Sequence, residues 1–170
     1  MKNFRFVIAL LCAATLFFTT GAIAATPESN NAIHIDIAST LKTAKVLFNM
    51  DHSAFAGDTP IGLAYMETML EKFKQDSTEW RLDAVFHGAG GYMLLDDEAY
   101  NNNRHTKTGN PYKTTIMNLM SRGVLIEECG KTMKANNWTN GNLLPGVKVN
   151  SGANFRIVDL VQQGFIMLQP

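Results

Sequence analysis

Apolar residues along this chain alternate between short continuous runs and longer stretches with helical spacing. The continuous runs, bounded by polar residues, are typical of buried strands and cover residues 45–50, 80–86, 124–128, 147–149 and 165–168. Helical spacing occurs between them, over residues 60–73, 112–120, 132–137 and 155–163. Five strands separated by helices predict an α/β fold, a three-layer sandwich with a five-stranded, mostly parallel sheet.

Local signals predict smaller features around this alternation. Isoleucine alternates with polar residues over residues 33–37, which predicts a short edge strand. Asp58 and Pro60 are a capping residue and a first-turn proline for the first helix. Residues 92–95 are predicted as a short helical segment or turn, and residues 101–111 as a polar loop.

The amino-terminal residues carry the three parts of an export signal in the required order. Lys2 and Arg5 precede an apolar run over residues 6–18, and Ala22-Ile23-Ala24 is a small-x-small cleavage site. The apolar run is shorter than the ~20 residues that a membrane-spanning helix needs. Residues 1–24 are therefore predicted to be a signal peptide, which predicts a periplasmic or secreted protein.

Removal of residues 1–24 changes the length and charge of the chain. It leaves 146 of the 170 residues, predicted as an extension (25–44) and one α/β domain (45–170). Lys2 and Arg5 are lost, so 13 Lys and Arg face 15 Asp and Glu, a formal net charge of −2. This balance lacks the basic footprint of nucleic-acid or anionic-membrane binding, so neither partner is predicted for the mature chain.

Cleavage of the signal would also leave one cysteine of two. Cys12 lies in the signal, so Cys129 would remain alone in an oxidising compartment without a partner for an internal disulfide. Four interpretations of Cys129 stay open: a reactive thiol, a ligand, an intermolecular cross-link or a buried small residue.

Three chemically capable residues follow the first three predicted strands of the domain. His52 comes two residues after the first strand, His87 follows the second and Cys129 follows the third. Carboxyl ends of parallel strands face a common crevice, and contiguous strands ~4.8 Å apart would bring the three residues within roughly 10 Å. Inert packing for Cys129, and a hydrogen bond to a loop carbonyl for each histidine, are the alternatives.

Cofactor signals are weak in this sequence. The two histidines and Cys129 lack the short paired spacing of metal motifs, so no metal site is predicted. The glycine-rich residues 88–91 follow the second strand and lack the dinucleotide spacing, so they indicate a tight turn. No cofactor is predicted.

Several stretches of this sequence, taken in order, resemble the DsrE/DsrF-like proteins, a group of small α/β sulfur-handling proteins, and in particular their exported single-domain members. They cover nearly the whole mature chain and are Lys45-Val46-Leu47-Phe48 leading to Asp51-His52, Val85-Phe86-His87-Gly88, Gly123-Val124-Leu125-Ile126-Glu127-Glu128-Cys129, Leu143-Leu144-Pro145-Gly146-Val147 with Ser151-Gly152, and Val158 to Phe165.

The resemblance implies sulfur chemistry at Cys129. It implies a persulfide on this cysteine that is accepted from, and passed to, a partner protein or a small sulfur compound, with His87 and His52 as neighbours. Family members form trimers or hexamers, which implies a homo-oligomer here. The alternative is a non-catalytic assembly module, or one that binds a small ligand or a metal in the same crevice.

Two departures from the family pattern bear on this inference. The relay members work in the cytoplasm, whereas this chain carries an export signal. Glu127 and Glu128 also directly precede the thiol, and nearby anions raise a thiol pKa, whereas a helix amino terminus or a protonated histidine lowers it. Because side chains alternate along a strand, at most one of these glutamates points the same way as Cys129.

Overall fold

The computed structural model describes residues 33–170, so the predicted signal peptide lies outside the described residues. Residues 39–170 form one unit, described from here on. Its main strands are β1 (Thr43–Met50), β4 (Glu79–Phe86), β5 (Leu125–Cys129), β6 (Lys148–Asn150) and β7 (Ile166–Leu168). Its helices are α1 (Ile61–Asp76), α2 (Asp97–Arg104), α3 (Lys113–Ser121), α4 (Gly130–Ala135) and α5 (Ala153–Gln162). Two 3-10 helices, Gly88–Leu94 and Asn140–Asn142, and the hairpin strands β2 (Phe55–Ala56) and β3 (Thr59–Pro60) complete the unit.

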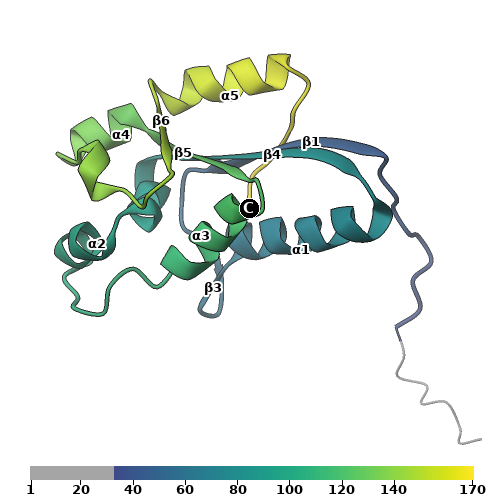
Figure 1. The fold of residues 1–170 in the computed structure, drawn as a ribbon, viewed down its shortest axis with the longest axis horizontal. Coiled ribbons are helices and arrows are strands. Elements are labelled where there is room, and N and C mark those ends of the chain that lie inside the picture. Colours follow the sequence, from purple (N-terminus) through teal and green to yellow (C-terminus); the bar gives the residue numbers. More distant parts are fainter. Residues whose placement is uncertain (1–32) are drawn as a thin grey trace, which may run out of the picture. The chain divides into compact units, whose positions relative to one another are not determined.

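The main strands form one parallel sheet in the order β6-β5-β4-β1-β7. Helix α5 covers one face, and α1 and α3 lie against the other (Figure 1). The predicted three-layer α/β sandwich with five parallel strands is confirmed. The first three predicted strands are neighbours as β5-β4-β1, so their carboxyl ends lie at one edge of the sheet.

The two faces of the sheet carry cores of very different size. Alternate residues of β1 point to opposite faces: Phe48 packs in the large core beneath α1 and α3, whereas Leu47 packs beneath α5. Among residues 33–170, six buried residues form the small core beneath α5: Leu47, Val85, Cys129, Ala153, Leu160 and Phe165. Helix α5 is therefore held by much less apolar contact than the helices opposite it.

Two predictions of local structure are wrong. Residues 33–37 form no strand, because alternation produces a strand only where a partner backbone pairs with it. The predicted polar loop at 101–111 begins as helix α2, because the Asp96 side chain accepts a hydrogen bond from the Ala99 amide at 2.7 Å and caps it. Arg104 in the last turn also favours this helix.

The start of α1 also differs from the prediction. Asp58 does not cap the helix, and Pro60 is the residue before its first turn rather than within it. The reason is the β2–β3 hairpin, which pairs Phe55 with Pro60 and turns through Gly57 at φ 61°. Within residues 33–170 no helix has both the length and the apolar character needed to cross a bilayer.

The glycine-rich residues 88–91 have a packing role that the sequence did not reveal. They begin the 3-10 helix Gly88–Leu94, which packs against the sheet beside β5. A Cβ atom at Gly91 would lie 2.6 Å from Oε1 of Glu128 and 3.1 Å from Cγ2 of Thr132. A larger residue at position 91 would force the buried Glu128 carboxyl to move.

Replacement of Gly91 by alanine should therefore destabilise the fold. Steric overlap with the Glu128 carboxyl should cost about 1–3 kcal/mol in the free energy of unfolding. Urea denaturation measures this cost. Gly141→Ala is the matched control, because a Cβ there meets only the Thr139 hydroxyl at 3.6 Å. Equal stability of the two variants would show that the Gly91 contact is unimportant.

Candidate functional site at the carboxyl end of β5

Cys129 lies where β5 ends and α4 begins. It is the last residue of the strand and the residue that precedes the first turn of α4. Its Sγ accepts a hydrogen bond from the backbone amide of Ala153, the first residue of α5, at 3.3 Å. The side chain is 4% exposed and packs in the small core beneath α5. Three elements therefore meet at this sulfur atom.

Hydrogen-bond donors surround the thiol despite its burial. Burial raises the pKa of the thiol. This effect is outweighed by hydrogen bonds that lower the pKa, from the amides of Thr132 and Ala153, the Thr132 hydroxyl and the Lys131 amide. The pKa of Cys129 therefore lies below its ordinary value. The Thr132 hydroxyl oxygen accepts a hydrogen bond from the Gly88 amide at 2.9 Å, which leaves its own proton available to the sulfur. The environment favours a thiolate.

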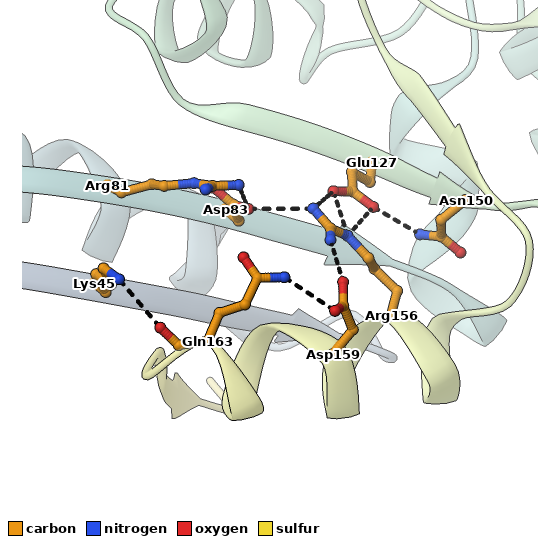
Figure 2. A network of polar contacts seen from close by, with 8 residues as sticks. All are labelled: Lys45, Arg81, Asp83, Glu127, Asn150, Arg156, Asp159 and Gln163. Carbon is orange, nitrogen blue, oxygen red and sulfur yellow. Dashed lines mark hydrogen bonds and ion pairs between the residues drawn. The ribbon is translucent and has the colours of Figure 1, made fainter.

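Glu127 is the glutamate that shares a face with Cys129, and its charge is compensated. Arg156 of α5 donates from Nε to both Glu127 carboxylate oxygens at 2.8 and 3.0 Å, and its Nη2 lies 2.7 Å from Oε1. Asn150 donates a further hydrogen bond to Oε2 at 3.1 Å. These contacts are seen in Figure 2. Glu127 therefore adds little uncompensated negative charge beside the thiol.

Glu128 points to the opposite face and is fully buried. Neither of its carboxyl oxygens has a hydrogen-bond partner among the described residues. Burial, together with a smaller effect of the neighbouring Cys129, raises the pKa of Glu128 to about 9. The group is therefore protonated at neutral pH. The sequence alone indicates that two anionic glutamates would raise the Cys129 pKa. In the structure Glu127 is compensated and Glu128 is protonated, so this effect is reduced.

His87 follows β4, beside Cys129 at the end of the neighbouring strand. Phe86 and Glu128 are register partners, so the backbones at His87 and Cys129 are adjacent. The ring, however, extends toward β1, where Nε2 bonds to Oδ1 of Asn49 at 2.8 Å. An amide oxygen only accepts, so Nε2 carries the proton and Nδ1 is the basic nitrogen. Burial lowers the pKa of His87, against an opposing effect of Asp51, so the ring is neutral at neutral pH.

His52 lies farther from the thiol, beyond the end of β1. Its Nδ1 bonds to Oδ1 of Asp51, whose other oxygen accepts a hydrogen bond from Gln169 at 3.0 Å, on the β7 side of the sheet. Cys129 lies on the other side of β4. Within residues 33–170 no hydrogen bond joins His52 or His87 to the thiol. The structure thus places the three residues along one edge without joining them into a triad.

Metal-ligating side chains do not cluster at the carboxyl ends of the described strands. In residues 33–170, no three His, Cys, Asp or Glu side chains converge as a metal ion would require. An open groove of about 700 Å³ lies at the opposite, amino end of β1 and β4, where Lys45, Trp80 and Arg81 line it.

Thr132 and Ala153 are the site residues that the sequence did not reveal. Ala153 donates to the Cys129 sulfur, both residues lower the thiol pKa, and neither belongs to a residue type or a spacing that indicates chemistry. The signal that was available is indirect: Cys129 directly precedes the predicted helix that begins near Thr132, and backbone amides are unpaired in the first turn of a helix. Ala153 reaches the sulfur only through the docking of α5.

Comparisons with known proteins support the fold. No family model matches the chain, and no curated protein does. Among solved structures, a protein of unknown function, MTH1491 from Methanobacterium thermoautotrophicum, is similar, with a TM-score of 0.58 and 21% sequence identity over 75% of this chain and 99% of that one. This similarity shows a shared α/β architecture.

Protonation of Glu128 predicts a specific dependence of stability on pH. Its folded pKa of about 9 exceeds the ordinary 4.5, so the folded protein keeps a proton that the unfolded chain releases. Between these pH values stability should fall as pH rises, by up to about 1.4 kcal/mol per pH unit. Glu128→Gln should remove this component, so its stability relative to wild type should increase steadily with pH.

Urea denaturation at a series of pH values between neutral and mildly alkaline tests this prediction. Glu79→Gln changes an exposed glutamate and is the control, which should follow the wild-type pH dependence. Parallel pH profiles for Glu128→Gln and wild type would mean that Glu128 titrates normally.

Proposed function

We propose that this protein is an exported carrier of sulfane sulfur that is similar to the DsrE/DsrF-like proteins and forms a persulfide on Cys129. The observation that carries the proposal is the position of the Cys129 sulfur among the donors of α4 and α5. These donors stabilise a thiolate, which is the nucleophilic form of cysteine. The crevice position, at the carboxyl ends of parallel strands, is where α/β sheets commonly bind ligands.

The proposed chemistry needs no organic cofactor. The Cys129 thiolate attacks the outer sulfur of a donor such as thiosulfate, an S–S bond forms to Cys129, and sulfite leaves with the electron pair of the broken bond. An acceptor thiolate then attacks the outer sulfur of the persulfide, and the Cys129 thiolate leaves. Each step exchanges one S–S bond for another, so no external oxidant or reductant is required.

Electrostatics around the thiol support this chemistry. Glu127 is paired with Arg156 and Glu128 is protonated, so the two glutamates that precede Cys129 do not add two negative charges to a persulfide. His87 is neutral and lies at the adjacent strand end, and we propose it as a nearby proton acceptor. His52 is paired with Asp51, and we propose it as a more distant neighbour of the thiol without a direct contact.

Partners and assembly belong to the same proposal. The sulfur donor or acceptor is a partner protein or a small sulfur compound, and the protein acts in the periplasm or outside the cell. A homo-oligomer is supported by exposed apolar side chains on the edge strand β7, namely Ile166, Met167 and Leu168, and a trimer or hexamer is proposed from the family resemblance.

A second candidate function is favoured by the burial of the thiol. At 4% exposure, Cys129 also fits a packing role in a non-catalytic module that binds a small ligand or assembles through the same crevice. The two functions differ in whether Cys129 takes up sulfur.

Exposure to thiosulfate or inorganic polysulfide followed by intact-mass measurement tests the proposal. The wild-type chain should gain the mass of one sulfur atom on Cys129, and a reducing agent should remove it. Cys129→Ser should lose this addition, because the mature chain without Cys12 has no other cysteine to carry it. Cyanide should also convert the added sulfur to thiocyanate, which is the reaction expected of sulfane sulfur.

The opposite result is equally definite. A folded wild-type chain that gains no sulfur at Cys129 from either donor, under conditions in which a small alkylating reagent modifies this thiol, would overturn the proposal and favour the non-catalytic module.

A further inference from the structure

Helix α5 covers the thiol and donates to it. Its first residue, Ala153, bonds to Sγ of Cys129, and Leu160 packs in the same small core. The reacting atom is thus shielded chiefly from the α5 face. Any reagent larger than a water molecule needs a movement of the protein to reach it, because the side chain is 4% exposed.

The apolar contact that holds α5 is slight. Of its large apolar side chains only Leu160 is fully buried, and Ile157 is half-buried. Phe155, Val158 and Val161 are exposed on the outer side, Phe155 to 64%. A helix with so little buried apolar area depends on other contacts to remain on the sheet.

Those contacts are polar and centre on Arg156. Its guanidinium binds Glu127 of β5 through two nitrogens and lies 3.5 Å from Oδ2 of Asp83 on β4. Its Nη1 also bonds to Asp159 of the same helix at 2.7 Å. We call Arg156 with Glu127 and Asp83 the latch (Figure 2). Three further contacts hold the helix in place: the Ala153 hydrogen bond to Cys129, Lys131 of α4 at 4.9 Å from the Phe155 ring centre, and Lys45, which donates to the carbonyl of Gln163 just after α5 at 3.1 Å.

Asp83 and Glu127 are buried, so removal of the arginine charge from the latch leaves buried carboxylates with less compensation. Asp83 keeps its own partner when Arg156 leaves, because Arg81 of the same strand donates to it at 3.1 and 3.2 Å. Glu127 keeps the Asn150 amide. Both carboxylates therefore retain one partner after α5 moves away.

We propose that α5 is a lid over Cys129, held closed by the latch and opening by rotation of the helix about its connections to β6 and β7. The connection to β7 contains Gly164 at φ 87°, and glycine there gives the backbone the conformational freedom that a pivot requires. The purpose of the lid, to admit a sulfur donor or acceptor to the thiol, rests on the proposed function. Opening itself does not.

Alkylation of Cys129 by iodoacetamide measures opening directly. The rate is followed by mass spectrometry on the peptide that contains Cys129, at the plateau of the pH–rate profile, so that differences in thiol ionisation cancel. Arg156→Gln should raise the rate about tenfold or more, because it removes the charge that pairs with Glu127. Arg122→Gln is the matched control: it breaks the Arg122–Glu71 ion pair, which ties α1 to the end of α3, and should leave the rate within about twofold.

Wild-type protein supplies a second readout that does not depend on folding of the variant. Lid opening exposes little surface, so the labelling rate should be nearly independent of urea below the unfolding transition. Amides of α5 should also exchange hydrogen faster than those of β1 and β4. A folded Arg156→Gln variant with the wild-type rate, or wild-type labelling that rises with urea as steeply as global unfolding, would overturn the lid.

This experiment separates the lid from the proposed function. Faster alkylation in Arg156→Gln without sulfur uptake by wild type would establish the lid and reject the sulfur carrier. Sulfur uptake by wild type, with no effect of Arg156→Gln on alkylation, would support the sulfur carrier and reject the lid.

Discussion

The hydrogen bond from the Ala153 amide to the Cys129 sulfur connects β5, α4 and α5 at one atom. It places the thiol beneath α5, and it is one of the donors that lower the thiol pKa against the effect of burial. A buried thiol without such donors would be neutral and inert. Ionisation of the thiol in the closed protein therefore depends on how α5 docks, and not on the cysteine alone.

The same docking governs the charges near the thiol. Arg156 compensates Glu127 only while α5 lies on the sheet, and Glu128 avoids a buried charge by keeping its proton. Removal of α5 from the sheet would thus expose the sulfur and weaken the compensation of Glu127 at once. Arg156 thus controls both the access of reagents to the Cys129 sulfur and the negative charge beside it. Its ion pairs also explain how α5 covers the site although most of its large apolar side chains are exposed.

Much of the fold could be predicted because the strands are continuous apolar runs with clear boundaries. The runs at 45–50 and 80–86 became β1 and β4, and their adjacency to β5 placed Cys129 at the expected edge. Strand alternation also predicted that Glu127 and Glu128 point apart. The environment of the thiol could not be predicted, because the contacts of Ala153 and the turn of His87 toward Asn49 depend on side-chain packing between segments distant in sequence.

Titration of the thiol in the folded protein tests the central claim most directly. The ultraviolet absorbance of the thiolate is measured against pH for wild type and for Cys129→Ser, and their difference isolates this one group. The account predicts a midpoint below the ~8.5 of an unperturbed cysteine. A midpoint at or above that value would show that burial outweighs the donors, and would contradict the assignment of Cys129 as a nucleophile.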